Sequence, residues 1–208
     1  MTSTSTGLFW THHSAGMMSA ALVVPLHAIL RDSFGKPARD RVFADAGFPD
    51  APPSGESVPE SKVVRLHNGV QDNWPDISPD LLDRAGRAAA EAVVTDRITP
   101  RAKVLLENMP WPMAAWLVGR SARQNARAFA GSGLFSVQTT GRFALINNPF
   151  ALHVRSAEPN CHFHAAFFEH MFQRLAHRDF KCREVACCAA GAEACTFVLS
   201  LDGQVPGD

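Results

Sequence analysis

Four residues near the C-terminus carry side chains that hold transition metals in proteins. Cys161 precedes a helical pattern, and Glu184, Cys187 and Cys195 follow in the segment Glu-Val-Ala-Cys-Cys-Ala-Ala-Gly-Ala-Glu-Ala-Cys. Three thiols and a carboxylate supply all four ligands of a closed tetrahedral zinc site, so no position is left for a reactive water. Such a site is structural, and the sequence identifies no catalytic residue.

The spacing alone leaves two interpretations open. Cys-x7-Cys is not a standard zinc-finger spacing, and cysteines are often small buried hydrophobic residues, as we expect for Cys182 and Cys188. A metal site also requires a bulge or an early turn near residues 185–188, because residues three apart in a regular strand face opposite ways. Backbone N–H groups would have to donate to the sulfur atoms, since this ligand set exceeds the charge of Zn²⁺ by two.

The elements that position these residues follow from the periodicity of the chain. Apolar residues at helical spacing predict helices over residues 17–34, 38–46, 81–98, 113–129 and 163–175, with a further helix starting at Pro100. Apolar and β-branched runs predict strands over residues 134–140, 142–147, 180–188 and 194–201, and residues 150–154 are expected to extend the sheet. This order predicts an α+β fold with helices packed on one face of an antiparallel sheet.

Composition divides the chain into four parts. Residues 1–16 are polar and rich in Ser and Thr, so we expect a disordered N-terminus. Residues 17–60 form a helical cap and a Pro-rich loop. Residues 61–202 form the main ligand-binding domain, and residues 203–208 are a tail.

The bulk composition narrows the class of protein. Of 208 residues, 46% are hydrophobic, and Lys+Arg and Asp+Glu are equal at 20 each, so no overall charge favours nucleic acid or an acidic membrane surface. Four of the five cysteines lie between residues 182 and 195, which favours reduced thiols over a secreted disulfide scaffold. No signal peptide or membrane-spanning run is present. We expect a cytoplasmic protein without a transmembrane segment.

Motifs for redox cofactors and nucleotides are missing from the sequence. No strand is followed by Gly-x-Gly-x-x-Gly, and the Ala-Gly-Ser-Gly of residues 130–133 follows a helix instead. The clustered cysteines do not have ferredoxin spacing. The sequence has no phosphate-binding Gly-x-x-x-x-Gly-Lys-[Ser/Thr] loop either.

One family carries a similar pattern. The C-terminal segment reads Cys–x22–Glu–x2–Cys–x7–Cys-Thr-Phe and resembles the 4-vinyl reductase domain. Residues 128–135 (Ala-Phe-Ala-Gly-Ser-Gly-x-Phe), Asn148-Pro149 and Phe167-Phe168-Glu169 are similar to its bacteriochlorophyll-biosynthesis branch. The resemblance covers about residues 60–201. It implies that the Cys, Glu, Cys and Cys hold zinc, as in phenol-sensing members, and that helices pack on a twisted antiparallel sheet, as in a vesicle-tethering subunit family.

The resemblance implies a tetrapyrrole ligand, which would be a divinyl protochlorophyllide, a chlorophyllide or an earlier magnesium porphyrin. Three functions stay open: binding and delivery of this pigment in photosynthetic bacteriochlorophyll biosynthesis, reduction of its 4-vinyl (8-vinyl) group, and small-molecule sensing. Vinyl reduction needs a hydride or electron donor, so the missing cofactor motifs favour binding and delivery. The expected partners are the pigment, other bacteriochlorophyll-biosynthesis enzymes and a second copy in a homodimer.

Five residues are candidates for the pigment pocket, which we expect to be a chamber between helices and sheet closed by the final hairpin. Its walls would be Trp116, Phe129 and Phe135, with Arg123 for a propionate and His164 as an axial ligand. Each has an ordinary alternative, which is core packing for the rings and His164, and a solvated helix face for Arg123. Glu169 and Glu193 are expected at the surface.

Overall fold

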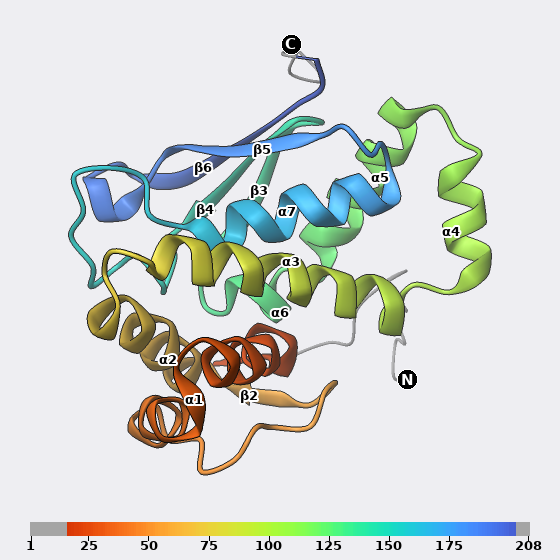
Figure 1. Ribbon diagram of the computed structural model, residues 1–208. Coiled ribbons are helices and arrows are strands. Elements are labelled where there is room, and N and C mark those ends of the chain that lie inside the picture. The colour runs from red at the N-terminus through yellow and green to blue at the C-terminus, as the bar shows by residue number, and fades with distance from the viewer. Residues whose placement is uncertain (1–15, 203–208) are drawn as a thin grey trace, which may run out of the picture.

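A four-stranded antiparallel sheet forms one side of the molecule, and helices cover one of its faces (Figure 1). The computed structural model describes residues 16–202. The strand order is β3-β4-β6-β5, with β3 at Leu134–Thr139, β4 at Arg142–Ile146, β5 at Lys181–Ala186 and β6 at Ala194–Ser200. In β6, alternate residues are fully buried, as expected for a sheet with one covered face. The predicted α+β fold is confirmed.

The helices lie in successive layers below the sheet (Figure 1). α5 (Trp111–Gln124) and α7 (His162–Leu175) contact the strands, and α3 (Ser78–Arg97) packs along α7. α1 (Val24–Asp45) and α2 (Glu60–Asn73) lie on the far side of α3. The remaining elements are short: α4 (Pro100–Glu107), α6 (Arg127–Ala130), the 3₁₀ turns η1 (Ala20–Leu22) and η2 (Cys188–Ala190), and the ribbon of β1 (Met17–Ser19) and β2 (Ser57–Pro59).

The contact between α3 and α7 depends on a glycine. A Cβ atom added at Gly86 would lie 2.3 Å from the carbonyl oxygen of Phe163. Leu82, Ala85 and Ala89 bury the same face of α3. Small residues at this contact therefore let the two helix backbones approach closely.

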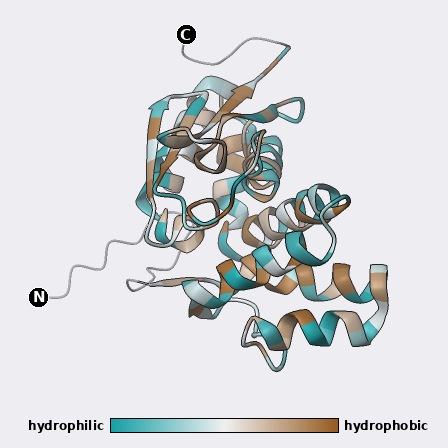
Figure 2. Cartoon of the chain, turned by 90° about the vertical axis from the view of Figure 1, so that its left-hand side faces the viewer, coloured by the Kyte–Doolittle hydropathy of each residue, from teal (hydrophilic) through white to brown (hydrophobic). Residues whose placement is uncertain are grey.

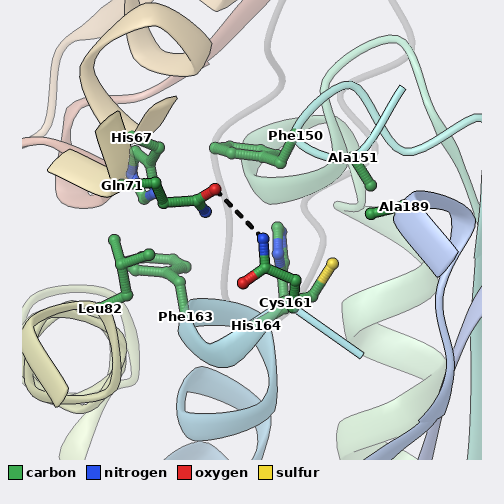
Figure 3. A pocket seen from close by; sticks show the side chains of 10 residues that line it. His67, Gln71, Leu82, Phe150, Ala151, Cys161, Phe163, His164 and Ala189 are labelled. Atoms are coloured by element: carbon green, nitrogen blue, oxygen red, sulfur yellow. Dashed lines mark hydrogen bonds between the residues drawn. The ribbon is translucent and has the colours of Figure 1, made fainter. Parts of the chain in front are cut away.

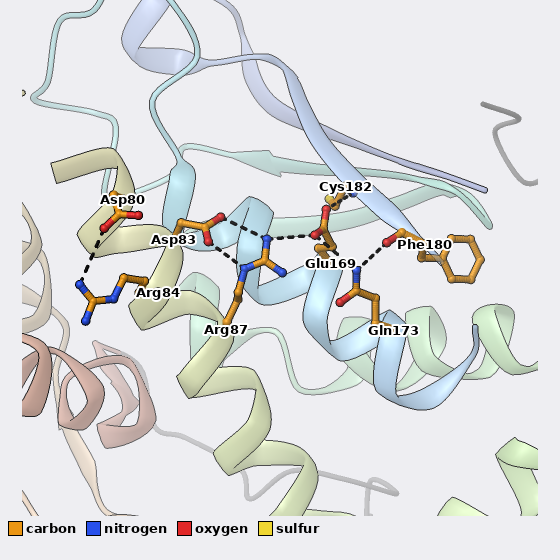
Figure 4. Close-up of polar contacts among 8 residues, drawn as sticks. All are labelled: Asp80, Asp83, Arg84, Arg87, Glu169, Gln173, Phe180 and Cys182. Carbon is orange, nitrogen blue, oxygen red and sulfur yellow. Dashed lines mark hydrogen bonds and ion pairs between the residues drawn. The ribbon is translucent and has the colours of Figure 1, made fainter. Parts of the chain in front are cut away.

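A buried carboxylate ties α7 to α3 and β5 (Figure 4). Glu169 Oε1 accepts a hydrogen bond from Arg87 at 3.0 Å, and Oε2 accepts from the backbone N–H of Cys182 at 2.9 Å. Gln173 donates to the carbonyl oxygen of Phe180 at 2.8 Å. Glu169 is buried, so the prediction of a surface position was wrong, because the charge is matched by a guanidinium and an edge-strand N–H group.

Phenylalanine rings fill the space between the sheet and the helices. The largest fully buried side chains include Phe129, Phe143, Phe167, Phe168, Phe172, Phe180 and Phe197. In Figure 2, brown apolar and teal polar residues alternate around the helices, as expected for helices with one buried face. The interior is therefore a packed aromatic core.

The structure differs from the sequence prediction in four places. α1 spans both predicted N-terminal helices and bends at Gly35, where φ is 79°. α2 was not predicted, and the predicted helix over residues 113–129 is interrupted after Gln124. Residues 150–154 form turns instead of a strand, because the N–H groups of residues 151 and 152 bond to Asn148. The predicted N-terminus, except residue 16, and the predicted tail lie outside the described residues.

Candidate metal centre and the adjacent ring-lined cavity

The structure brings Cys161, Glu184, Cys187 and Cys195 together in a buried cluster whose ligand atoms all lie within 4.8 Å of one another. The Sγ atom of Cys161 lies 3.8 Å from that of Cys187 and 3.6 Å from that of Cys195, and the last two are 3.8 Å apart. A tetrahedral ion with metal–sulfur bonds of about 2.3 Å places its sulfur ligands about 3.8 Å apart. This cluster can therefore hold a metal ion.

Each ligand is positioned by its own element. Cys161 is the residue before the first turn of α7, Glu184 lies on β5 and Cys195 on β6. The pairing of β5 with β6 shifts between Glu184 and Ala186, which is a β-bulge at Val185. The predicted irregularity at residues 185–188 is confirmed, and it brings Glu184 and Cys187 to the same side.

The electrostatics of the cluster fit a cation. Glu184 Oε2 accepts a hydrogen bond from the backbone N–H of Cys161 at 2.7 Å, whereas Oε1 is buried without a partner in residues 16–202. Burial raises the pKa of Glu184 to about 7. Hydrogen bonds from Cys161 and Cys195 hold the pKa of Cys187 well below its usual range. The pKa of Cys161 is raised by its bonds to the same thiols and by burial, so the sulfurs alone keep one thiolate, and a divalent cation would stabilise all three.

Two N–H sources surround the sulfur atoms. The side-chain amide of Asn148 donates to Cys161 Sγ at 3.3 Å and to Cys195 Sγ at 3.4 Å. The backbone N–H of Cys188 donates to Cys195 Sγ at 3.3 Å. Such donors spread the excess negative charge of a thiolate-rich site. The role of Asn148 was not predicted, although the Asn148-Pro149 pair already belonged to the family resemblance.

A small cavity of about 20 Å³ lies beside the metal cluster (Figure 3). A hydrogen bond of 3.1 Å from Asn160 to Gln71 crosses it. The volume has room for one water molecule. Most of its lining comes from rings, namely His67, Phe150, Phe163 and His164.

Two buried imidazoles face this cavity. His164 Nε2 lies 3.2 Å from the carbonyl oxygen of Phe129, and His67 Nε2 lies 3.0 Å from that of Leu22. Burial lowers the pKa of both histidines to about 4, so both rings are neutral near pH 7. Because a carbonyl only accepts, each Nε2 carries the proton and each Nδ1 keeps a lone pair. His67 was not singled out in the sequence, although its spacing from Val63 and Val70 is helical.

The five predicted pigment-pocket residues fall into two separate groups. Phe129 and Phe135 pack edge to face at 5.1 Å in the core, and His164 lies beside them at the cavity. Trp116 and Arg123 are exposed on α5. The expected open chamber is not found at the predicted walls, because aromatic rings fill that space. A flat macrocycle would need the core around the cavity to open.

Comparisons with known proteins agree with this site. The family model of the 4-vinyl reductase domain matches residues 143–201, which include all four residues of the metal cluster. The chain is 37% identical over 185 residues to the bacteriochlorophyll synthase 23 kDa chain of Cereibacter sphaeroides, covering 88% of this chain and 89% of that protein. It is 31% identical over 179 residues to the protein of the same name from Rhodobacter capsulatus, covering 85% and 83%.

Solved structures show a similar fold at low identity. An H-NOX protein from S. oneidensis superposes with a TM-score of 0.54 at 11% identity, covering 89% of this chain and 99% of that one. An H-NOX protein from K. algicida gives a TM-score of 0.53 at 11% identity, covering 88% and 96%. At this identity the likeness concerns the fold alone.

Within residues 16–202, none of the helices has both the length and the apolar character needed to cross a bilayer. The relatives above cover most of the chain at 37% and 31% identity. The 4-vinyl reductase domain accounts for its C-terminal part. This chain belongs to the family of the bacteriochlorophyll synthase 23 kDa chains, and its C-terminal 4-vinyl reductase domain carries the cysteine-rich centre.

Proposed function

We propose that this protein is an accessory chain of bacteriochlorophyll biosynthesis that binds a tetrapyrrole intermediate and delivers it to a partner enzyme. The observation that carries the proposal is its 37% identity, over 88% of its length, to a protein named as one chain of a bacteriochlorophyll synthase. A magnesium porphyrin or divinyl chlorophyllide is the expected ligand. The expected partners are the other enzymes of the pathway and a second copy of the chain, in a cytoplasmic setting.

The metal in this proposal is a structural Zn²⁺ ion. Thiolate ligands and a tetrahedral spacing of sulfur atoms are typical of zinc. The unpartnered Oε1 of Glu184 supplies the fourth donor. With four protein ligands, the ion has no open position, and its role is to fix α7, the β5–β6 hairpin and the side chain of Asn148 relative to one another.

We place the pigment site at the ring-lined cavity. Its lining is mostly aromatic, as binding sites for flat apolar ligands are, and the two neutral imidazoles present lone pairs suited to an axial bond with the central Mg²⁺. Phe129 and Phe135 would form the next layer of the wall. Because the cavity holds about 20 Å³, entry requires a rearrangement.

The segment from residue 147 to residue 161 is the part that can open the cavity. It contains no helix or strand, so moving it breaks few backbone hydrogen bonds. Phe150 from this segment packs between the two imidazoles, at 4.9 Å from the ring centroid of each. Displacing Phe150 would uncover both histidines at once.

Titration of the purified full chain with a magnesium divinyl porphyrin tests the proposal. We expect a shift of the pigment absorption bands at micromolar concentration, and weaker binding by His164→Gln, which keeps a donor for the Phe129 carbonyl. Arg123→Gln is the matched control on the exposed face of α5 and should bind as the wild type does. The absence of any shift with the wild-type protein would overturn the proposal.

The same reaction mixtures distinguish delivery from catalysis. Addition of NADPH or reduced ferredoxin should leave the divinyl pigment unchanged if the chain only binds and delivers. Formation of monovinyl pigment by the purified chain would instead identify it as the vinyl reductase.

A further inference from the structure

The helices α4 and α5 expose large apolar side chains at one end of the molecule (Figure 1). Val104 and Leu105 on α4 are 57% and 58% exposed, and Met113 and Trp116 on α5 are 56% and 53% exposed. Single exposed apolar residues need no explanation, but four on two consecutive, contacting helices form a concentration that usually marks an interaction site.

Cationic residues continue the exposed row on α5. Met113, Trp116, Arg120 and Arg123 follow one another at steps of three and four residues, so they share one face of the helix. The guanidinium of Arg120 lies over the ring of Trp116, 5.7 Å from its centroid. Within residues 16–202, neither Arg120 nor Arg123 forms an ion pair with a carboxylate.

The balanced net charge of the chain conceals an uneven distribution. Residues 98–157 contain seven Lys or Arg and a single acidic residue, Glu107, although the whole chain has 20 of each sign. Five of the seven lie between residues 101 and 127, in or beside α4 and α5. The exposed apolar side chains therefore stand in a region of positive charge.

We propose that α4 and α5 form a docking surface for an anionic lipid bilayer. Tryptophan and aliphatic side chains beside arginines are the combination that holds amphipathic helices in the interface of an anionic membrane. α4 has 8 residues and α5 has 14, which is too short to span the hydrocarbon core, so both would lie on the surface. The unpaired arginines complement lipid phosphates.

This surface is distinct from the proposed pigment site, so its test does not depend on pigment binding. It assigns Trp116 and Arg123 to lipid contact, while Phe129, Phe135 and His164 stay with the cavity. An acidic protein partner would use the same arginines, but it would not account for four apolar residues that are each more than half exposed.

Co-sedimentation of the full chain with vesicles tests the proposal. We expect binding to vesicles of equal parts phosphatidylcholine and phosphatidylglycerol, weakened by salt, and little binding to phosphatidylcholine alone. Arg120→Glu combined with Arg123→Glu should reduce binding at least about 20-fold, since each basic residue at an anionic surface is worth about fivefold. Val104→Ser combined with Leu105→Ser should also weaken it.

The control reverses two arginines elsewhere. Arg31→Glu combined with Arg178→Glu makes the same change of net charge at side chains that are 54% and 90% exposed. This variant should keep at least half of the wild-type binding. Equal losses in the control and in the α5 variant would overturn the proposal, as would a wild-type protein that does not sediment with the anionic vesicles. Unchanged melting temperatures show that each variant is folded.

Discussion

The two ends of the molecule use their polar and apolar side chains in opposite ways. At the C-terminal hairpin, thiols, a carboxylate and an asparagine amide are buried against one another, with one carboxylate oxygen left over for a cation. At α4 and α5, arginines lie in solvent without carboxylate partners, beside exposed Trp116. The comparison teaches that the first end organises the fold, whereas the second is suited to association.

Removing a ligand at the hairpin end should have the largest effect. Cys187→Ser should lose the bound ion and lower the free energy of unfolding by more than about 4 kcal/mol, because metal binding is coupled to folding. Elemental analysis and thermal melting with and without chelator measure both quantities. Cys188→Ser is the matched control, and it should keep one ion per chain. A full equivalent of metal in Cys187→Ser would remove this end from the comparison.

Acid should destabilise the core beside the metal centre through His67, which lies on α2 outside the ligand set. Its pKa is about 4 in the folded protein, because burial disfavours the charged ring, against 6.5 ordinarily. Between pH 6.5 and pH 4 the unfolded chain therefore binds a proton that the folded chain does not, and stability falls as pH falls. The loss should reach about 3 kcal/mol at pH 4.

Melting curves of the wild type and His67→Gln between pH 7 and pH 4 measure this contribution. Any acid release of metal is common to both proteins, so the difference between their curves isolates His67. The variant should have the shallower pH dependence. Parallel curves would show that His67 does not stay neutral in the folded protein.

Crowding the contact between α3 and α7 should have an intermediate effect. Gly86→Ala should cost about 2 kcal/mol, because the added methyl group would meet the Phe163 carbonyl and push the helices apart. Gly69→Ala on α2 is the control, since its Cβ meets only Val42, at 3.5 Å. It should stabilise the protein by up to about 1 kcal/mol. Denaturant unfolding of both variants checks the sign of each change.

The exposed end should contribute least to stability. Val104→Ser should change the free energy of unfolding by less than about 0.5 kcal/mol, because the side chain is more than half exposed. Denaturant titration measures this change. A loss above about 1 kcal/mol would mean that α4 supports the fold, and the contrast between the two ends would then be wrong.

The sequence predicts the metal cluster well because its chemistry is local. Cys161 precedes a clear helical period, the hairpin brings Cys187 and Cys195 together, and the required bulge is present at Val185. The contribution of Asn148 was missed because an asparagine in a loop shows no period, and only the tertiary fold places its amide beside two sulfur atoms.

The pigment residues were harder to predict because a helical pattern does not say which face is covered. Trp116 has the ring expected of a pocket wall, but the covered face of α5 is built from Ala114, Ala115 and Val118. α2 was missed because its apolar positions follow a Pro-rich stretch and include a histidine. Strands β3 to β6 were predicted nearly at their observed limits, since their turns contain clear glycine signals.

Both ends of the segment over residues 147–161 are fastened at the same place, by the Asn148 amide at its start and by Cys161 at its finish. The ring of Phe150 that separates the two imidazoles hangs from this double attachment. An ion held by those sulfurs would act as a clasp on the flap over the histidines. Loading of the centre would then govern how readily the flap lifts, and so link the supply of one metal to the handling of a pigment built around another.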